Sequence, residues 1–481
     1  MPPSPRYLPS RRHADLGDAF FDIVAPASFP RHELRYRNQA WAARIGLAEL
    51  DDEEWLDHFG RFAPLPDGFP APLALRYHGH QFQVYNPDLG DGRGFLFAQV
   101  HDLADGRLLD LGTKGSGRTP WSRGGDGRLT LKGGVRELLA SSMLEALGVD
   151  TSKTFSLIET GEELIRGDEP SPTRSSVLVR LSHSHIRIGT FQRFAYHEDR
   201  AALSRLLDHA VQTYLPDAWR EQESPRALAF LEQVVAAVAR TGAQWLAAGF
   251  VHGVLNTDNI NITGESFDYG PWRFLPTYDP GFTAAYFDHG GLYAFGRQPT
   301  TLLWNLTRLA ECLLPLAPQS ELERVLTGFR TVFPRELAVA VRRRLALRSG
   351  GEQAEGELVE ALFEFLQESQ APFEQVFFDW RGGLASAHRA GASPIAAMYE
   401  APAFERLRRA MAALEPAVEP GLDYAYFARR RPVTMLIDEV EGLWAPIASA
   451  DDWAPLADRL AAIGEMAAAY GTTPRLPAQP R

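Results

Sequence analysis

A short loop between helix-like segments constrains this chain more than any other stretch. Residues 251–259 read Val-His-Gly-Val-Leu-Asn-Thr-Asp-Asn, so that the carboxylate of Asp258 stands beside the amide of Asn259. A second carboxylate follows in the turn Asp268-Tyr269-Gly270. Phosphotransfer sites of the protein-kinase pattern use an Asn and an Asp to hold magnesium on the phosphates. The pattern therefore predicts a nucleotide-dependent transfer site with Asn259 and Asp268 as metal ligands.

The usual proton acceptor of that pattern is missing from this loop. In the pattern His-x-Asp-x-x-x-x-Asn, an Asp stands five residues before the Asn. Val254 occupies that position here, and valine cannot accept a proton. Asp258 is the only acidic residue in the loop, so the base is either Asp258 or a residue elsewhere in the chain.

Two glycine-rich segments precede the loop. In residues 89–94, Gly90, Gly92 and Gly94 alternate with Asp91 and Arg93, which lets backbone N–H groups approach an anion. The same residues would also suit an ordinary hairpin turn. Residues 110–136 contain six Lys/Arg and two Asp, although the whole chain has a net charge of −12. This reversal of sign predicts an anion site, and the alternative is a solvated flexible loop.

A lysine, a glutamate and two arginines complete the predicted site. Lys114 ends a strand-like run, and Glu137 lies in the first turn of a helix expected over residues 134–147. Kinases use such a glutamate to hold the lysine that contacts the phosphates. Arg180 and Arg187 are natural phosphate clamps because a guanidinium binds two phosphate oxygens at once.

The order of strand-like and helix-like segments indicates an α+β, bilobal protein-kinase-like fold. Strands are expected over 94–101, 108–113, 155–159 and 175–181, and helical patterns dominate from about residue 195. We predict three parts. They are an N-terminal extension over 1–75, irregular except for a short helix at 38–46; a small β-rich N-lobe over 76–190; and a larger, mostly helical C-lobe over 191–481 with extra C-terminal helices.

Charge and composition exclude several classes of protein. The net charge of −12 argues against nucleic-acid binding, which needs a basic surface. No apolar run approaches the ~18 residues of a membrane span. Pro2, Pro3, Pro5 and Pro9 do not suit an amphipathic transit helix, so we expect a cytoplasmic protein. The single cysteine, Cys312, excludes an internal disulfide.

Several long motifs, occurring in order, resemble the selenoprotein O family of kinase-like protein AMPylators. The similar segments are His78-Gly79-His80-Gln81-Phe82, Leu89-Gly90-Asp91-Gly92-Arg93, residues 111–120, residues 252–259 and Asp268-Tyr269-Gly270-Pro271.

The resemblance implies a specific activity. Members of that family bind ATP turned around, so that the α-phosphorus faces the acceptor, and transfer AMP to Ser, Thr or Tyr hydroxyls of proteins; some use UTP with manganese. The resemblance implies that the protein binds a nucleotide together with Mg²⁺ or Mn²⁺, and that its substrates are proteins with hydroxyl side chains. We also expect the protein to be a monomer. By resemblance, Asp258 is the proton acceptor, Asn259 and Asp268 bind the metal, and Glu137 is the partner of Lys114. The nucleotide-binding residues are Gly90, Gly92, Arg93, Lys114, Asp126, Gly127, Arg180 and Arg187.

Two other interpretations remain. A small-molecule kinase of the aminoglycoside-phosphotransferase type also uses a His-Gly loop, but it requires an Asp at position 254. An inert pseudokinase scaffold would not need Lys114, Glu137, Asn259 and Asp268 together.

Overall fold

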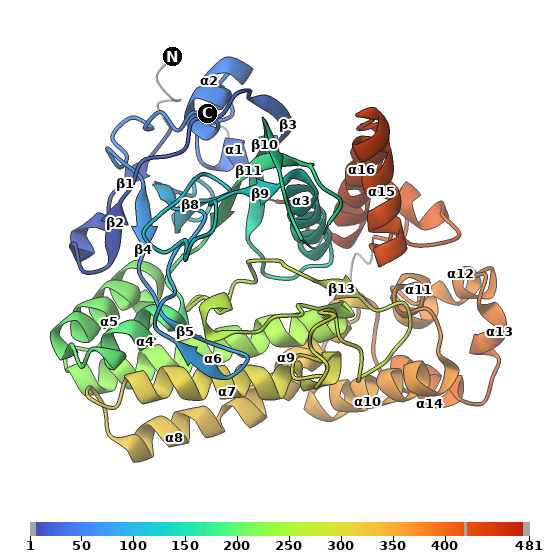
Figure 1. The fold of residues 1–481 in the computed structure, drawn as a ribbon. Coiled ribbons are helices and arrows are strands. Elements are labelled where there is room, and N and C mark those ends of the chain that lie inside the picture. The colour runs from blue at the N-terminus through green and yellow to red at the C-terminus, as the bar shows by residue number, and fades with distance from the viewer. Residues whose placement is uncertain (1–5, 168, 418–420, 475–481) are drawn as a thin grey trace.

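The computed structural model describes residues 6–167, 169–417 and 421–474. Three of the N-terminal prolines that do not suit a transit helix, Pro2, Pro3 and Pro5, lie outside these ranges. Figure 1 shows a sheet-rich N-terminal part above a layer of long helices, which makes the fold mixed α/β. None of the helices among the described residues is long and apolar enough to cross a bilayer.

A nine-stranded sheet organises the N-terminal part. The predicted hairpin is confirmed, because β7 (Leu96–His101) pairs antiparallel with β8 (Leu108–Lys114). The strand order is β2 (Phe21–Ile23), β4 (Leu73–Leu75), β7, β8, β11 (Thr173–Ser182), β10 (Lys153–Leu164) and β3 (Glu33–Arg37), with β1 (Pro9–Ser10) on β7 and β9 (Leu129–Thr130) on β11.

The short helix expected at 38–46 is present, but the expectation that the rest of the chain before residue 76 is irregular is wrong. This segment supplies β1 to β4 and two helices, α1 (Gln39–Arg44) and α2 (Asp52–Phe59). Trp55 of α2 is fully buried and stacks on Phe155 of β10 with ring centroids 4.8 Å apart. Strands of two to five residues carry too little periodicity to be recognised, because their partners in the sheet, not their own sequence, stabilise them.

Helix α3 (Leu131–Ala146) packs against β10 and β11 and carries Glu137. It begins three residues earlier than predicted, because the Oγ1 atom of Thr130 accepts a hydrogen bond from the N–H of Gly133 at 3.1 Å. Glu137 therefore lies in the second turn of the helix and not in the first.

The helical part is built around the long buried helix α6 (Glu223–Ala247), which contacts α7, α8 and α9. Helix α6 begins at Glu223, and Pro334 lies inside α9 (Phe329–Arg344). The other helices are α4 (Ile188–Tyr196), α5 (Arg200–Tyr214), α7 (Gln298–Cys312), α8 (Gln319–Thr327), α9 (Phe329–Arg344), α10 (Glu352–Ser369), α11 (Phe373–Asp379), α12 (Ala387–Gly391), α13 (Ala396–Tyr399) and α14 (Phe404–Ala412).

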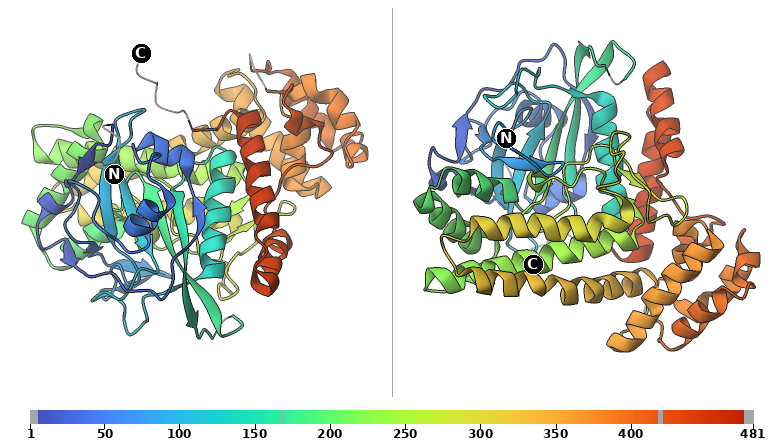
Figure 2. Two further views of the ribbon diagram at one scale, coloured as in Figure 1. Left: turned by 90° about the horizontal axis from the view of Figure 1, so that it is seen from above. Right: turned by 60° about the horizontal axis from the view of Figure 1, so that its bottom comes forward.

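The last two helices return to the N-terminal part of the chain. Helices α15 (Ile437–Ala450) and α16 (Ala454–Tyr470) pack against α3, and Figure 2 shows them beside it in red. The extra C-terminal helices therefore support the helix that carries Glu137.

Two small hairpins bring the motif loops together. Strands β12 (Phe250–Val251) and β13 (Arg273–Phe274) pair on either side of the segment that carries Asp258 and Asp268. Strands β5 (Gly79–Gln81) and β6 (Val84–Asn86) form a hairpin that reaches down from the sheet toward the helices in Figure 1.

Candidate active site

A cavity of about 690 Å³ lies between the sheet and the loop of residues 251–268. Its wall holds eight Lys/Arg and four Asp side chains, so its charge is opposite in sign to that of the whole chain. Such a concentration of cations suits a polyphosphate. The predicted residues in the wall are Gly90, Gly92, Arg93, Lys114, Asp126, Gly127, Arg180, Arg187, Asp258, Asn259 and Asp268.

Glu137 lies behind the cavity wall, against Lys114. The Nζ atom of Lys114 contacts Oε1 of Glu137 and lies 2.9 Å from Oδ1 of Asp268. Both Lys114 and Glu137 are buried, and they come from β8 and α3. The pair gives the lysine a definite position at the edge of the cavity.

Asp268 is held by cations on three sides. Besides Lys114, the Nη1 atom of Arg180 lies 3.2 Å from Oδ1 of Asp268, and Nη1 of Arg187 lies 3.9 Å from Oδ2. Burial acts to raise the pKa of Asp268, but these three positive charges together hold it well below its usual range. Asp268 is therefore ionised, as a metal-binding carboxylate must be.

Arg187 connects the two halves of the site. Its Nη1 atom donates to the backbone oxygen of Asp258 at 3.1 Å, and its Nη2 atom donates to Oδ1 of Asp91 at 3.3 Å. The guanidinium also lies over the ring of Tyr77, 4.3 Å from the ring centroid. Asp91 stands in the predicted Gly-rich loop, but the sequence alone does not identify it as the partner of Arg187.

Asp258 is a buried carboxylate with an unused acceptor atom. Among the described residues, Oδ1 of Asp258 is buried and accepts no hydrogen bond. Burial raises the pKa of Asp258 to about 7, although Arg187 acts in the opposite direction. Gly79 lies against this carboxylate, because a Cβ atom there would stand 2.8 Å from Oδ1. A carboxylate with a free oxygen and a pKa near neutrality can serve as a general base.

The side chain of Asn259 is oriented by the residue at the usual base position. Its Nδ2 atom donates to the backbone oxygen of Val254 at 2.9 Å. The amide oxygen, on the other side of the same group, is left for a different contact. Asn259 and Asp268 both line the cavity and offer hard oxygen donors, so the residues present fit Mg²⁺ or Mn²⁺.

The β5–β6 hairpin is fastened to this loop. The backbone N–H of His80 donates to Oγ1 of Thr257 at 2.7 Å, and the N–H of Phe82 donates to Oδ1 of Asn256 at 3.1 Å. His80 itself, in strand β5, bonds through Nδ1 to Gln192 at 2.7 Å. These contacts join residues far apart in the chain, so no local pattern signals them.

The Gly-rich segments pack closely on each other. A Cβ atom at Gly90 would overlap the ring of Trp121, and one at Gly92 would stand 2.8 Å from the backbone oxygen of Trp121. The glycines are thus required for this approach of the two loops. Asp126 pairs with Arg166 at 2.8 Å at the rim of the cavity.

Arg128 of the basic segment is not available to phosphates, because its Nε and Nη2 atoms bind the carboxylate of Glu162 at 2.7 and 2.9 Å. Arg118 and Arg123 also line the cavity, and within the described residues neither forms an ion pair.

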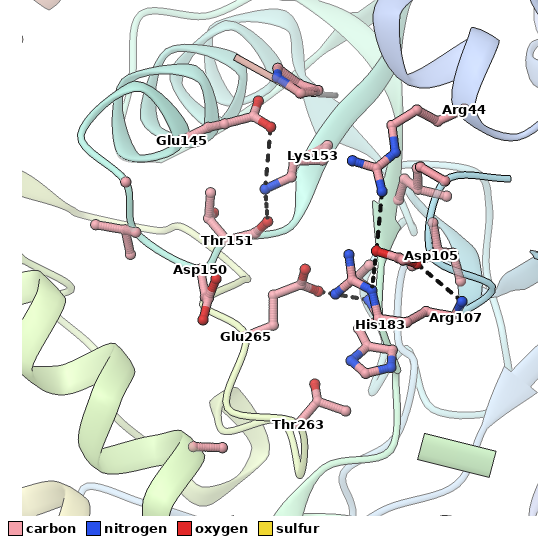
Figure 3. A pocket seen from close by; sticks show the side chains of 18 of the residues that line it. Arg44, Asp105, Arg107, Glu145, Asp150, Thr151, Lys153, His183, Thr263 and Glu265 are labelled. Carbon is pink, nitrogen blue, oxygen red and sulfur yellow. Dashed lines mark hydrogen bonds and ion pairs between the residues drawn. The ribbon is translucent and has the colours of Figure 1, made fainter. Parts of the chain in front are cut away.

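A larger cavity, with a volume of about 1120 Å³, lies elsewhere. Its wall holds five Lys/Arg and five Asp/Glu side chains, so it has no excess of positive charge, and several of them pair, as Figure 3 shows for Lys153 with Glu145 and for Arg44 and Arg107 with Asp105. Cations that are already neutralised bind phosphates weakly. The smaller cavity, where cations exceed carboxylates, is therefore the candidate active site.

Comparison with known proteins relates this chain to a family of enzymes. The family model described as "Protein adenylyltransferase SelO" matches residues 7–463. A relative from Synechocystis sp. named protein nucleotidyltransferase YdiU is 44% identical over 466 residues, covering 92% of this chain and 95% of its own. Relatives of the same name from Gloeobacter violaceus and Trichormus variabilis are 46% and 49% identical, over 92% and 76% of this chain and 92% and 74% of their own lengths.

Proposed function

This chain belongs to the SelO family of protein adenylyltransferases, and from that premise we propose that it transfers AMP from ATP to Ser, Thr or Tyr hydroxyls of proteins, with the nucleotide inverted in the cavity. It is a protein nucleotidyltransferase, as its relatives are named. We further propose that the sheet-rich and helical parts correspond to the lobes of a kinase-like fold, and that the protein acts in the cytoplasm.

The free oxygen of Asp258 is the observation that carries the proposal. A buried acceptor without a donor is costly, and a hydroxyl group entering the site would satisfy it. The usual kinase base position holds Val254, which cannot take up a proton. The acceptor hydroxyl is therefore expected at Asp258 and not at position 254.

Three cations support the orientation of the nucleotide. Lys114, Arg180 and Arg187 converge on Asp268, and phosphate oxygens of the nucleotide would share these cations with the carboxylate. If the β- and γ-phosphates lie there, the α-phosphorus is the reacting centre next to Asp258.

In the proposed reaction, Oδ1 of Asp258 accepts the proton of the acceptor hydroxyl as its oxygen forms the bond to the α-phosphorus. The bond between the α-phosphorus and the bridging oxygen to the β-phosphate breaks, and pyrophosphate leaves with its charge stabilised by Lys114, Arg180 and Arg187. Asn259 and Asp268 would hold Mg²⁺ or Mn²⁺, which supplies additional positive charge on the phosphates.

The test uses ATP labelled separately at the α- and the γ-phosphate, with Mg²⁺ or Mn²⁺ and a mixture of proteins as acceptors. We expect the α-label alone to become covalently attached to protein. Transfer of the γ-label alone would reject the proposal in favour of a kinase. The same assay with α-labelled UTP decides whether UMP is also transferred.

A further inference from the structure

Exposed aromatic side chains gather beside the loop that carries Asp258. Tyr286 is 80% exposed, Phe287 44% and Phe82 36%. The ring centroids of Tyr286 and Phe287 are 5.1 Å apart, and those of Phe287 and Phe82 are 5.7 Å apart. We call these three side chains the aromatic ridge. Large apolar side chains that are exposed together indicate a surface for a binding partner.

The ridge is built on the candidate active site itself. The N–H of Phe82 donates to Oδ1 of Asn256 at 3.1 Å and to the hydroxyl of Tyr293 at 3.2 Å. The Tyr293 hydroxyl in turn donates to Oδ1 of Asn256 at 2.7 Å. Asn256 lies two residues before Asp258 in the same loop. The position of the ridge is therefore coupled to the position of the base.

The turn that presents Phe82 is strained. Phe82 has φ of +50° and the next residue, Gln83, has φ of +63°, a region that side-chain-bearing residues rarely adopt. Strain of this kind persists where the surrounding structure enforces it, and it concentrates at functional sites. Here the two residues form the loop of the β5–β6 hairpin, a turn that requires positive φ at both positions, and the hydrogen bonds to Asn256 and Tyr293 hold Phe82 with its ring at the surface.

The ridge continues the wall of the cavity. Gln81, the neighbour of Phe82, lines the cavity together with Asn256 and Asp258. With a nucleotide filling the cavity, a protein that places a hydroxyl at Asp258 must continue outward over the surface next to it. The ridge forms part of that surface. Because the ridge is apolar, the acceptor protein should place an apolar side chain against it.

We propose that the aromatic ridge binds the acceptor protein through an apolar side chain close in sequence to the modified hydroxyl residue. This inference rests on the proposed function and adds a substrate class to it, namely segments in which a Ser, Thr or Tyr has an apolar neighbour. An aliphatic side chain half-buried on aromatic rings contributes about tenfold in affinity.

The test compares synthetic peptides that each contain one serine, with leucine or asparagine at successive flanking positions. For the wild-type protein we expect leucine at one position to raise kcat/KM for α-label transfer about tenfold. In the double variant Tyr286→Ser, Phe287→Ser, the preference should disappear through a higher KM for the leucine peptide. Its kcat and its affinity for ATP should stay as in the wild type, which also shows that the variant is folded.

Tyr424→Ser provides a matched control, because Tyr424 is 51% exposed and does not line the cavity. It should keep the wild-type preference. Equal kcat/KM for all peptides with the wild-type protein would overturn the inference while leaving the transferase function intact. If the wild-type protein sedimented as a dimer and the double variant as a monomer, with unchanged peptide kinetics, the ridge would be an interface with a second copy of this chain. That result would also overturn the inference. Absence of α-label transfer by the wild-type protein would overturn the proposed function and the inference with it.

Discussion

Arg180 donates its Nε–H to Nε2 of His185, 3.3 Å away. The other ring nitrogen, Nδ1, lies 3.4 Å from Oδ2 of the buried Asp110. Burial lowers the pKa of His185, so the ring is neutral, and its proton must be on Nδ1 if Nε2 accepts from Arg180. The chain Asp110–His185–Arg180 thus directs the guanidinium toward Asp268.

We expect His185→Phe to weaken ATP binding about ten- to a hundredfold, since Arg180 loses the group that orients it and hydrogen bonds to charged groups contribute about 1.5–3 kcal/mol. His185→Gln should recover most of the affinity, because its amide oxygen can accept from Arg180. Calorimetric titration with ATP measures both effects. Wild-type affinity for ATP in His185→Phe would mean that His185 acts only by filling space.

Replacement of the candidate base should separate chemistry from binding. General-base assistance is worth ~10²–10⁴-fold in rate, so Asp258→Asn should lower AMP transfer by about that factor. Its affinity for ATP should change little, because the cations that face the phosphates remain. Single-turnover transfer of the α-label and equilibrium binding of ATP test the two statements separately. A large loss of ATP affinity would contradict the assignment of Asp258 as a base.

Asp268→Ala should have opposite effects with and without metal. The carboxylate neutralises Lys114, Arg180 and Arg187, so its removal leaves these cations free for phosphates. In the presence of a chelator we expect the variant to bind ATP more tightly than the wild-type protein. With Mg²⁺ or Mn²⁺ we expect no detectable transfer. Weaker binding of ATP in the chelator would show that Asp268 does not compete with the phosphates for these cations.

Gly79→Ala should displace the base without a change of charge. The added Cβ would stand 2.8 Å from Oδ1 and 3.1 Å from Cβ of Asp258. We expect AMP transfer to fall at least tenfold with ATP affinity preserved. Gly167→Ala is the matched control, because a Cβ there meets no atom within 4 Å. Wild-type rates in Gly79→Ala would mean that the carboxylate position is not critical.

Buried histidines should make the fold sensitive to acid. Burial lowers the pKa of His13 to about 3 and that of His209 to about 4, with Asp110 acting in the opposite direction in both cases. In the unfolded chain histidine titrates near pH 6.5. Below that pH the unfolded state binds protons that the folded state does not. These two histidines therefore cost no free energy of unfolding above pH 6.5. Between pH 6.5 and about pH 4 the free energy of unfolding falls by about 1.4 kcal/mol per pH unit for each of them.

Urea unfolding of the wild-type protein and of His13→Phe between pH 5 and 8 tests this dependence. The variant should show the smaller loss of stability with acid. His289→Phe, at an exposed position, should behave as the wild type. Identical slopes for the wild-type protein and His13→Phe would contradict the expectation.

The sequence by itself determined the loop that carries the candidate site residues and the strands and helices that are long enough to show a period. Asp258, Asn259 and Asp268 lie within one short segment, where the chain spacing largely sets the distances between side chains. The hairpin from β7 to β8 and helix α3 were predictable for the same reason, since both depend on local pattern.

Only the tertiary structure decided how these elements meet. His80 is bonded to Thr257 across 177 residues, and Arg180 is paired with Asp268 across 88. Gly79, Asp91 and His185 acquire their roles only through such contacts. Docking of one element on another is driven by burial of apolar surface, as with Trp55 on Phe155, and this force is not directional. The residues of a motif can therefore be predicted from the sequence. The partners that orient them cannot, because they depend on which surfaces the core brings together.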